Sequence, residues 1–598
     1  MKQTIISTAV ATAIMFGATG CGDNKTKDET VQALQQATSK ISLEKRKEAF
    51  EKKIKALSSK GLDVNRTNEG QYLMTVKDEK QVLSSLLNMM NAGTTSPQDR
   101  AVIEELLKDA KIGVDVDWNK YASNTKESVF AYYLGNGKEV PYVAKIFSEK
   151  KIAAYLSYDG KDQLKQVNIK DIDETIKVDT NTTHIVLKGM HAVIQKSPTQ
   201  DSNESAYDLY GGSFSYEMID QENNNTLSFS YKNPECKITK TNAYLGKEQC
   251  TFPSFDIDFK STAQEEINIH FAMKDTSFTY DNTAKNNKVS SNLDFQISSI
   301  DITGKAGTDN GSMHMNDIKA LLKVDNIDES ILKSYMTLLQ NPPKDYNKIV
   351  TQVMSFVGKM YSSGMTFNST VSVASMHGES DKGTFTLDTY KGQGKGSFDK
   401  TINYQETDSI KNITVQDKKT KKTLFALNHF RFGYGISDLY NFIPPFMDFS
   451  GRIAVQSQSK NPQLPDDLKK KLTDMGNNLV HHGFGFSLDP IGWDAIEGEA
   501  KGQTFKGGKT DFNIHARLKK NNIPLDLNNP MTAMMLMPYF QADGKLVLKK
   551  KDLEQLSKNM PPQMLGMLMM FAKYEGENAV FVLKFENGHL MINGQPVM

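Results

Sequence analysis

The feature that most constrains the fold is a regular alternation of apolar and polar residues. It is clearest in residues 214–218, 227–231, 255–259, 267–273 and 293–297. Successive side chains of a β-strand point to opposite faces, so this period of two predicts strands with one apolar and one polar face. The linkers between them are rich in Asn, Asp, Gly and Lys, which favours antiparallel connections. We therefore expect an α+β, β-rich fold of extended antiparallel β-sheet, curved into a groove, with packed amphipathic helices.

Helical periodicity interrupts the strand pattern at several places. An amphipathic helix is expected within 28–60, where Gly61 is placed as its stop. Further helices are expected at 79–91, 97–110, 331–339, 346–361, 469–480, 551–558 and 562–574. A closing hairpin is expected at 580–592, because Asn587-Gly588 is a strong signal for a two-residue turn.

The start of the chain has the pattern of an export signal. Lys2 precedes an apolar stretch over 5–16, and small residues then lead into Cys21. The sequence Ala18-Thr19-Gly20-Cys21 resembles the lipobox of bacterial lipoproteins, in which the cysteine is diacylglycerated and becomes the first residue of the mature chain. We expect a signal peptide at 1–20 and lipidation of Cys21, with acyl chains anchoring the protein to a membrane. A conventional signal cut near the same place is the alternative.

The remaining two cysteines, Cys236 and Cys250, lie fourteen positions apart in a segment that would be exported. Exported compartments are oxidising, and two cysteines make one bridge, so a disulfide is expected. A metal site or a redox pair is the alternative, but the chain has no CxxC motif and no histidine lies close to either cysteine.

The patterns divide the chain into five parts. We expect a signal peptide at 1–20, a lipid-anchored tether and amphipathic helix at 21–60, and an N-terminal α+β region at 61–200. An antiparallel β region with the disulfide follows at 201–324, and a C-terminal α+β region at 325–598.

The C-terminal region is similar to the YdgA-like bacterial envelope family, whose function is unknown. The resemblance is carried by the paired helical segments 331–339 and 349–360, the strand start Gly364-Met365-Thr366-Phe367 and the closing segment 585–595. It implies an exported, sheet-rich, non-enzymatic protein. It supplies no catalytic residues.

Known chemical motifs are mostly not found in the sequence. Residues 502–510 and 392–396 are glycine-rich, but no helix follows either segment, so both are predicted to be turns rather than phosphate loops. The adjacent His481 and His482 are expected in a solvated turn rather than at a metal. We expect no catalytic residues, no metal and no cofactor.

Four asparagines match the D/E-x-N-x-S/T acceptor of bacterial N-glycosylation: Asn65, Asn181, Asn203 and Asn224. They are candidate glycosylation sites, and the alternative is a set of polar surface turns. Methionines crowd 531–537 and 560–570, which indicates either a core of helices on a sheet or an adaptable surface for apolar ligands.

Charge and composition narrow the function. The chain has 598 residues with 72 basic and 71 acidic side chains, so no basic surface for nucleic acid is expected. We expect a non-enzymatic, lipid-anchored protein of the bacterial cell envelope that handles lipids or maintains the envelope. It would face the periplasm from the outer membrane, with membrane lipids or an envelope protein as partner. The alternatives are a surface-exposed adhesin or interaction lipoprotein and, less favoured, a hydrolase with dispersed catalytic residues.

Overall fold

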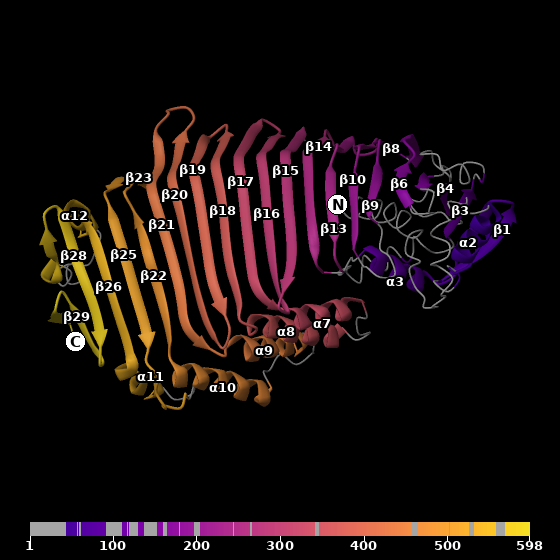
Figure 1. The fold of residues 1–598 in the computed structure, drawn as a ribbon. Coiled ribbons are helices and arrows are strands. Elements are labelled where there is room, and N and C mark those ends of the chain that lie inside the picture. Colours follow the sequence, from indigo (N-terminus) through magenta and orange to yellow (C-terminus); the bar gives the residue numbers. More distant parts are fainter. Residues whose placement is uncertain are drawn as a thin grey trace. The chain divides into compact units, whose positions relative to one another are not determined.

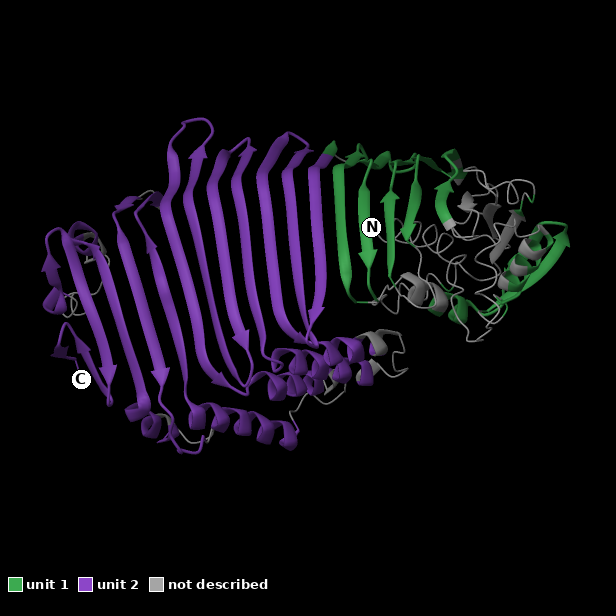
Figure 2. Cartoon of the chain, viewed as in Figure 1, with its two compact units in different colours: residues 1–268, 339–341 green, residues 269–338, 342–598 purple. Residues whose placement is uncertain are grey.

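The computed structural model is β-rich, and its large antiparallel sheet does not close on itself. The structure describes residues 43–597 except 57, 59–60, 91–103, 105–109, 117, 119–129, 137–151, 159–163, 179, 197–203, 243, 264–265, 341–345, 457–464, 501–502, 526–530 and 558–568. The chain forms two compact units (Figure 2): unit 1 comprises residues 1–268 and 339–341, and unit 2 comprises residues 269–338 and 342–598.

Unit 1 consists mainly of short antiparallel strands. Its elements are α2 (Leu43–Ala56), β1 (Leu62–Asn68), β2 (Gln71–Val76), α3 (Glu79–Met90), β3 (Ala110–Val116), β4 (Phe130–Asn136), β5 (Ile152–Tyr158), β6 (Leu164–Ile169), β7 (Ile172–Val178), β8 (Asn181–Lys188), β9 (His191–Lys196), β10 (Ser205–Tyr210), β11 (Ser213–Asp220), β12 (Asn225–Lys232), β13 (Glu235–Lys240) and β14 (Gly246–Ser261). One half of β14 pairs with β13 and the other half with β12, so β14 joins two rows of strands.

Unit 2 contains longer strands, up to 20 residues in β17. Its elements are β15 (Ile267–Lys285), β16 (Lys288–Ala306), β17 (Asp309–Asp328), α7 (Glu329–Gln340), α8 (Tyr346–Tyr361), β18 (Met365–Ser380), β19 (Gly383–Phe398), β20 (Thr401–Asp417), β21 (Thr423–Tyr440), α9 (Ile443–Gln456), α10 (Asp466–His482), β22 (Phe484–Trp493), β23 (Ala495–Ala500), β24 (Gln503–Gly507), β25 (Thr510–Leu518), α11 (Met531–Leu536), the 3₁₀ turn η3 (Met537–Tyr539), β26 (Phe540–Lys549), α12 (Lys550–Ser557), β27 (Lys573–Glu575), β28 (Asn578–Glu586), β29 (His589–Ile592) and β30 (Gln595–Pro596).

Neighbouring strands of unit 2 are antiparallel, and most of its helices lie at one edge (Figure 1). The pairing runs β16–β17–β18–β19–β20–β21–β22–β25–β26–β28–β29. Helices α7 and α8 connect β17 to β18, α9 and α10 connect β21 to β22, and α11 connects β25 to β26. The connections at the opposite edge between β16 and β17 and between β18 and β19 are short turns. We call the edge that carries these helices the helical edge.

Residues with positive φ form a line across the long strands of unit 2. Asp317 on β17, Thr389 on β19 and His429 on β21 have φ of 48°, 47° and 50°. Each lies at a one-residue gap in the strand register, and pairing resumes unchanged on both sides of the gap. We call this line the crease.

The apolar positions change parity at the crease. On β20 the apolar residue on the helical-edge side of the crease is Ile410, and the next ones beyond it are Ile413 and Val415. On β18 the corresponding residues are Val373 and Met376. A spacing of three instead of two therefore marks the crease in the sequence.

The predicted elements agree with the structure at most of the described positions. The helix expected at 346–361 is α8, and the final hairpin forms with Asn587 and Gly588 at φ of 53° and 79°. Residues 503–507 form strand β24, which pairs with β23, and a turn at Gly508 and Lys509 leads into β25, which pairs with β22 and β26. A strand and not a helix follows this turn, as expected. The helices are few and mostly short, and the described residues do not show a packed helical layer over the sheet. The domain boundaries at 61, 201 and 325 stay predictions.

Three sequence predictions were wrong. Residues 392–396 lie inside β19 and not in a turn, because the alternating Gly392, Gly394 and Gly396 still make the backbone pairs of a ladder. His481 and His482 are the last residues of helix α10 and not part of a turn. Lys573–Glu575 is strand β27, which pairs with β28, so the helix expected at 562–574 does not extend to its predicted end.

Candidate functional site

Unit 2 presents a continuous apolar surface on one side of its sheet. Residues directly opposite each other on antiparallel strands point to the same side, so the register defines rows of side chains. The first row is Phe295, Ala320, Val371, Gly392, Asp408, Phe432, Ile491, Phe512, Leu546 and Phe581. The second is Leu293, Leu322, Ser369, Gly394, Glu406, Tyr434, Leu488, Ile514, Gly544 and Leu583. The third is Ser291, Val324, Phe367, Gly396, Tyr404, Ile436, Phe486, Ala516, Ala542 and Phe585.

We call these three rows the apolar face. At about 4.8 Å between neighbouring strands, a row that crosses all of them is about 43 Å long. Asp408 and Glu406 are the only charged residues in the three rows. The opposite side of the same strands is polar, as in the row Gln296, Lys319, Ser372, Lys391, Ser409 and Arg431.

The apolar face is only partly buried. Among its large apolar side chains Phe581 alone belongs to the buried core, at 4% exposure, whereas Val371 and Phe486 are 39% and 40% exposed. The remaining large apolar side chains of the three rows are half-buried. A sheet normally buries its apolar face against a second layer. Among the described residues, α12 covers only the end of the first row, where its Leu553 packs in one cluster with Leu546 and Phe581. The apolar face is therefore available to a ligand.

The two carboxylates of the apolar face are held by tyrosines. Tyr390 donates a hydrogen bond of 2.7 Å from its hydroxyl to Oδ1 of Asp408. The hydroxyls of Tyr404 and Tyr434 donate to the same oxygen, Oε2 of Glu406, at 2.5 and 2.6 Å. We call these five residues the β20 cluster.

Glycines make room for the β20 cluster. Gly392 and Gly394 lie directly opposite Asp408 and Glu406 on β19. A Cβ atom at Gly392 would lie 2.7 Å from the hydroxyl oxygen of Tyr390, and one at Gly394 would lie 3.3 Å from that of Tyr404. The tyrosine rings therefore need glycine on the neighbouring strand.

The carboxylates raise the pKa values of the tyrosines around them. The hydrogen bond to Asp408, helped by burial, raises the pKa of Tyr390 to about 12. Burial first, and the hydrogen bond to Glu406 second, raise the pKa of Tyr404. The hydrogen bond to Glu406 raises the pKa of Tyr434. All three tyrosines are thus neutral donors at physiological pH.

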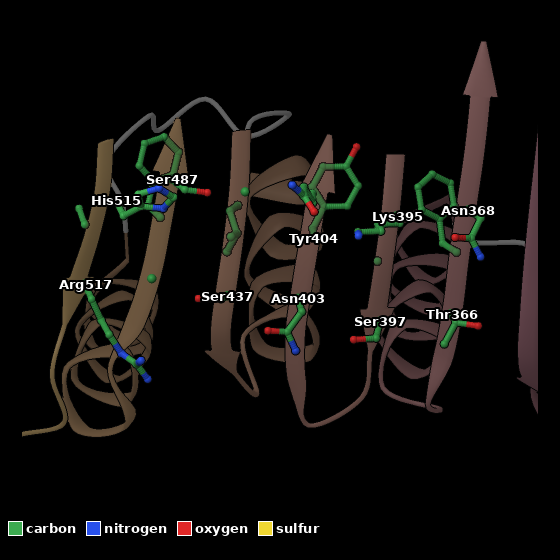
Figure 3. A pocket seen from close by; sticks show the side chains of 18 of the residues that line it. Thr366, Asn368, Lys395, Ser397, Asn403, Tyr404, Ser437, Ser487, His515 and Arg517 are labelled. Carbon is green, nitrogen blue, oxygen red and sulfur yellow. The ribbon is translucent and has the colours of Figure 1, made fainter. Parts of the chain in front are cut away.

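A pocket of about 920 Å³ lies across the same strands (Figure 3). Most of its lining residues belong to the polar side, and Phe367, Tyr404 and Phe486 of the third row also line it. Its walls carry long polar side chains, among them Lys395 from β19 and His515 and Arg517 from β25. Arg517 forms an ion pair of 3.0 Å with Asp438, and Nε2 of His515 lies 3.2 Å from Oδ2 of Asp489. Its floor is formed by small residues in cross-strand pairs: Gly435 with Ser487 and Ser437 with Gly485. The pocket offers hydroxyl, amide and cationic donors to a polar ligand.

The predicted site residues are not brought together in one place. Cys21 and Asn203 lie outside the described residues. Cys236 and Cys250 form the expected disulfide, directly opposite each other on β13 and β14, and this prediction is confirmed. Asn65 is exposed on β1, Asn181 is the first residue of β8, and Asn224 is exposed in the turn between β11 and β12. Glycosylation of these asparagines stays a prediction.

The sequence analysis did not single out the β20 cluster. Its signal is Tyr404, Glu406 and Asp408 at every second position of a strand, where the alternation calls for apolar side chains. Within the part of the chain that the structure describes, His, Cys, Asp and Glu side chains form no group of three suited to a metal ion. Nor does any helix in that part have the length and apolar character needed to span a membrane.

Comparison with known proteins finds no matching family model, no matching curated protein and no matching solved structure. The resemblance to the YdgA-like family therefore stays a prediction.

Proposed function

We propose that this protein is a non-enzymatic lipoprotein of the bacterial cell envelope that binds lipid acyl chains on its apolar face. One observation carries the proposal: three rows of largely apolar side chains in unit 2 that no described part of the chain covers, apart from the end of the first row beneath α12. Leaving apolar surface in water is unfavourable by about 25 cal/mol per Å². An acyl chain is flexible and wholly apolar, so it can cover these rows without a matching polar partner.

In this proposal the crease shapes the binding surface into a groove. Left-handed residues such as Thr389 interrupt the alternation of side chains, and the apolar positions change parity at the same place. The two changes compensate, so the apolar residues before and after the crease line one side of a bent sheet. Gly392 and Gly394, opposite the β20 cluster, have no side chains and therefore leave more space in the middle of this groove.

The anchor and the compartment belong to the same proposal. Acyl chains on Cys21 would hold the protein to the outer membrane, facing the periplasm. The Cys236–Cys250 disulfide supports an oxidising compartment, where such bridges persist. Intact mass before and after alkaline hydrolysis of ester-linked chains tests this part. An unprocessed chain without acyl groups would contradict it.

Lipid binding is tested on protein purified from a detergent-free extract. We expect native mass spectrometry to find bound phospholipid or fatty acid, and a fluorescent fatty acyl probe to bind the delipidated protein. A protein that carries no lipid and takes up no probe would overturn the proposal.

A pair of substitutions on opposite sides of the sheet locates the site. Val371 is 39% exposed on the apolar face, and Leu321 is 48% exposed on the other side, opposite Thr370. Val371→Asp should weaken probe binding at least fivefold, because it places a carboxylate among the acyl contacts. Leu321→Asp is the matched control and should leave binding unchanged. Equal effects of the two would show that the probe does not use the apolar face.

A surface-exposed interaction lipoprotein is the second candidate, and the polar pocket favours it. The pocket is lined mostly by residues of the polar side of the sheet and offers hydrogen-bond donors to a partner. Proteolysis of intact cells separates the two candidates. An adhesin would be cleaved, whereas a protein facing the periplasm would be spared until the outer membrane is opened.

A further inference from the structure

A short apolar segment stands exposed at the helical edge of unit 2. It comprises α11, η3 and the first residue of β26, that is residues 531–540, and we call it the edge segment. Its exposed side chains are Met531 at 55%, Met534 at 61%, Met535 at 52%, Met537 at 50%, Tyr539 at 37% and Phe540 at 39%. No residue of the segment is charged. Soluble proteins seldom expose so many neighbouring large apolar side chains unless the surface binds something.

The edge segment is continuous with the apolar face. Phe540 packs its ring against Phe585, with the ring centroids 5.8 Å apart. Phe585 is the last residue of the third row. An apolar path therefore leads from the exposed methionines onto the sheet.

Two lysines flank the segment. Lys519 and Lys520 follow the end of β25 and are both exposed. The backbone N–H of Lys519 donates a hydrogen bond of 2.8 Å to the carbonyl oxygen of Tyr539, which fixes these lysines beside the segment. Flexible methionines, a tyrosine and flanking lysines are the combination that suits the interface of an anionic bilayer.

We propose that the edge segment docks on the surface of an anionic phospholipid bilayer, with its methionines among the acyl chains and Lys519 and Lys520 at the headgroups. The inference rests on the proposed function: docking here places the end of the apolar face against the membrane, and acyl chains would enter from that membrane. A second copy of the chain is the competing occupant, and the test below tells it apart from a bilayer.

The experiment is vesicle flotation of the full chain carrying Cys21→Ala, so that acylation contributes to no sample. Vesicles are phosphatidylcholine with phosphatidylglycerol at 3:1, or phosphatidylcholine alone. Met534→Glu with Met535→Glu should weaken binding to the mixed vesicles at least tenfold. Lys519→Glu with Lys520→Glu should remove the preference for the mixed vesicles. Met534 and Met535 are more than half exposed, so the fold should tolerate these changes.

Met570→Glu is the matched control. Met570 is 65% exposed. The side chain of Asn593 donates hydrogen bonds to the carbonyl oxygens of the adjacent Phe571 and of Val580 on β28. Val580 is five residues along β28 from Phe585, which contacts the edge segment. This variant should bind vesicles within twofold of the unsubstituted chain. Equal losses in both methionine variants, or no loss in the double variant, would overturn the proposal. A dimer seen by sedimentation and broken by the double variant would assign the segment to a second copy.

The two proposals fail separately. The Met534→Glu and Met535→Glu chain should still bind the soluble fatty acyl probe, since the apolar face is untouched. If the double variant loses vesicle binding but the unsubstituted chain never takes up the probe, the docking surface is supported and the proposed function is overturned.

Discussion

Tyr404 and Glu406 lie two residues apart on β20 and are joined by a hydrogen bond of 2.5 Å from the tyrosine hydroxyl to the carboxylate. The pair sits in the middle of an otherwise apolar face, where Tyr434 supplies a second donor to the same oxygen at 2.6 Å. A carboxylate among apolar side chains is tolerated when its hydrogen bonds are satisfied. The β20 cluster is therefore a polar group of side chains whose hydrogen bonds are made within the cluster, and single substitutions can test it.

Removing the carboxylate should destabilise unit 2. Glu406→Leu leaves the hydroxyls of Tyr404 and Tyr434 without their acceptor, and we expect a loss of about 1–3 kcal/mol in the free energy of unfolding. Glu379→Leu is the control, because Glu379 is an exposed partner of Lys418 and exposed ion pairs contribute about 0–1 kcal/mol. Urea denaturation measures both. Equal small effects would mean that solvent satisfies the two hydroxyls as well as Glu406 does.

Raising the pH above about 10 should destabilise the protein through its buried and hydrogen-bonded tyrosines. The pKa of Tyr390 is raised to about 12 by its bond to Asp408, and that of Tyr207 to about 12 by burial. The folded state holds both in the neutral form, while the unfolded chain ionises near pH 10. Their contribution is therefore complete below pH 10 and is lost as the pH rises towards 12. Urea midpoints at pH 9, 10 and 11 measure the loss.

Tyr390→Phe checks the assignment. Phenylalanine does not titrate, so the fall in stability between pH 10 and 11 should be shallower in this variant than in the unsubstituted protein. An unchanged slope would show that Tyr390 does not contribute to it.

The disulfide should stabilise unit 1 against unfolding. Closing a loop of 14 residues stabilises a fold by about 3 kcal/mol through the entropy of the unfolded chain. The double variant Cys236→Ser, Cys250→Ser should lose about that amount in chemical denaturation, and Cys21→Ser should lose none. Reduction of the unsubstituted protein should reproduce the loss, and a reduced protein of full stability would refute the expectation.

Individual helices, strands and turns were predicted better from the sequence than the pairing of the strands with one another. Alternation located the strands, and Asn587-Gly588 located a turn, because these signals are local. The strand order β21–β22–β25–β26 is set by pairing between segments tens of residues apart, which no short pattern encodes. The edge segment illustrates the same limit: its methionines were open to a core or a surface interpretation, and only their exposure decides for the surface.

The glycines of β19 show why one strand was missed. Residues 392–396 read as a turn because glycine is favoured in turns and rare in strands. In the structure they give space to side chains of other strands. Alanine at Gly394 would put a Cβ atom 2.8 Å from Oγ of Ser369 and 3.3 Å from the ring of Phe367.

Gly394→Ala should therefore destabilise the protein by about 1–3 kcal/mol, as overpacking does. Gly311→Ala on β17 is the control, because its nearest neighbour, the carbonyl oxygen of Glu379, is 3.7 Å from the new Cβ atom. That change should be neutral or slightly stabilising. Differential scanning calorimetry compares them, and a tolerated Gly394→Ala would show that the neighbouring side chains give way.

The crease offers the last test. Thr389 holds a φ of 47°, which a β-branched residue adopts only under strain, whereas asparagine tolerates this region. Thr389→Asn should thus raise the free energy of unfolding by about 0.5–1 kcal/mol. Thr386→Asn is the matched control on the same strand, in regular pairing with His377 and Thr414, and should lower it, because asparagine is a poor strand former. If both changes lower stability alike, Thr389 is an ordinary strand residue in solution and the sheet is not creased there.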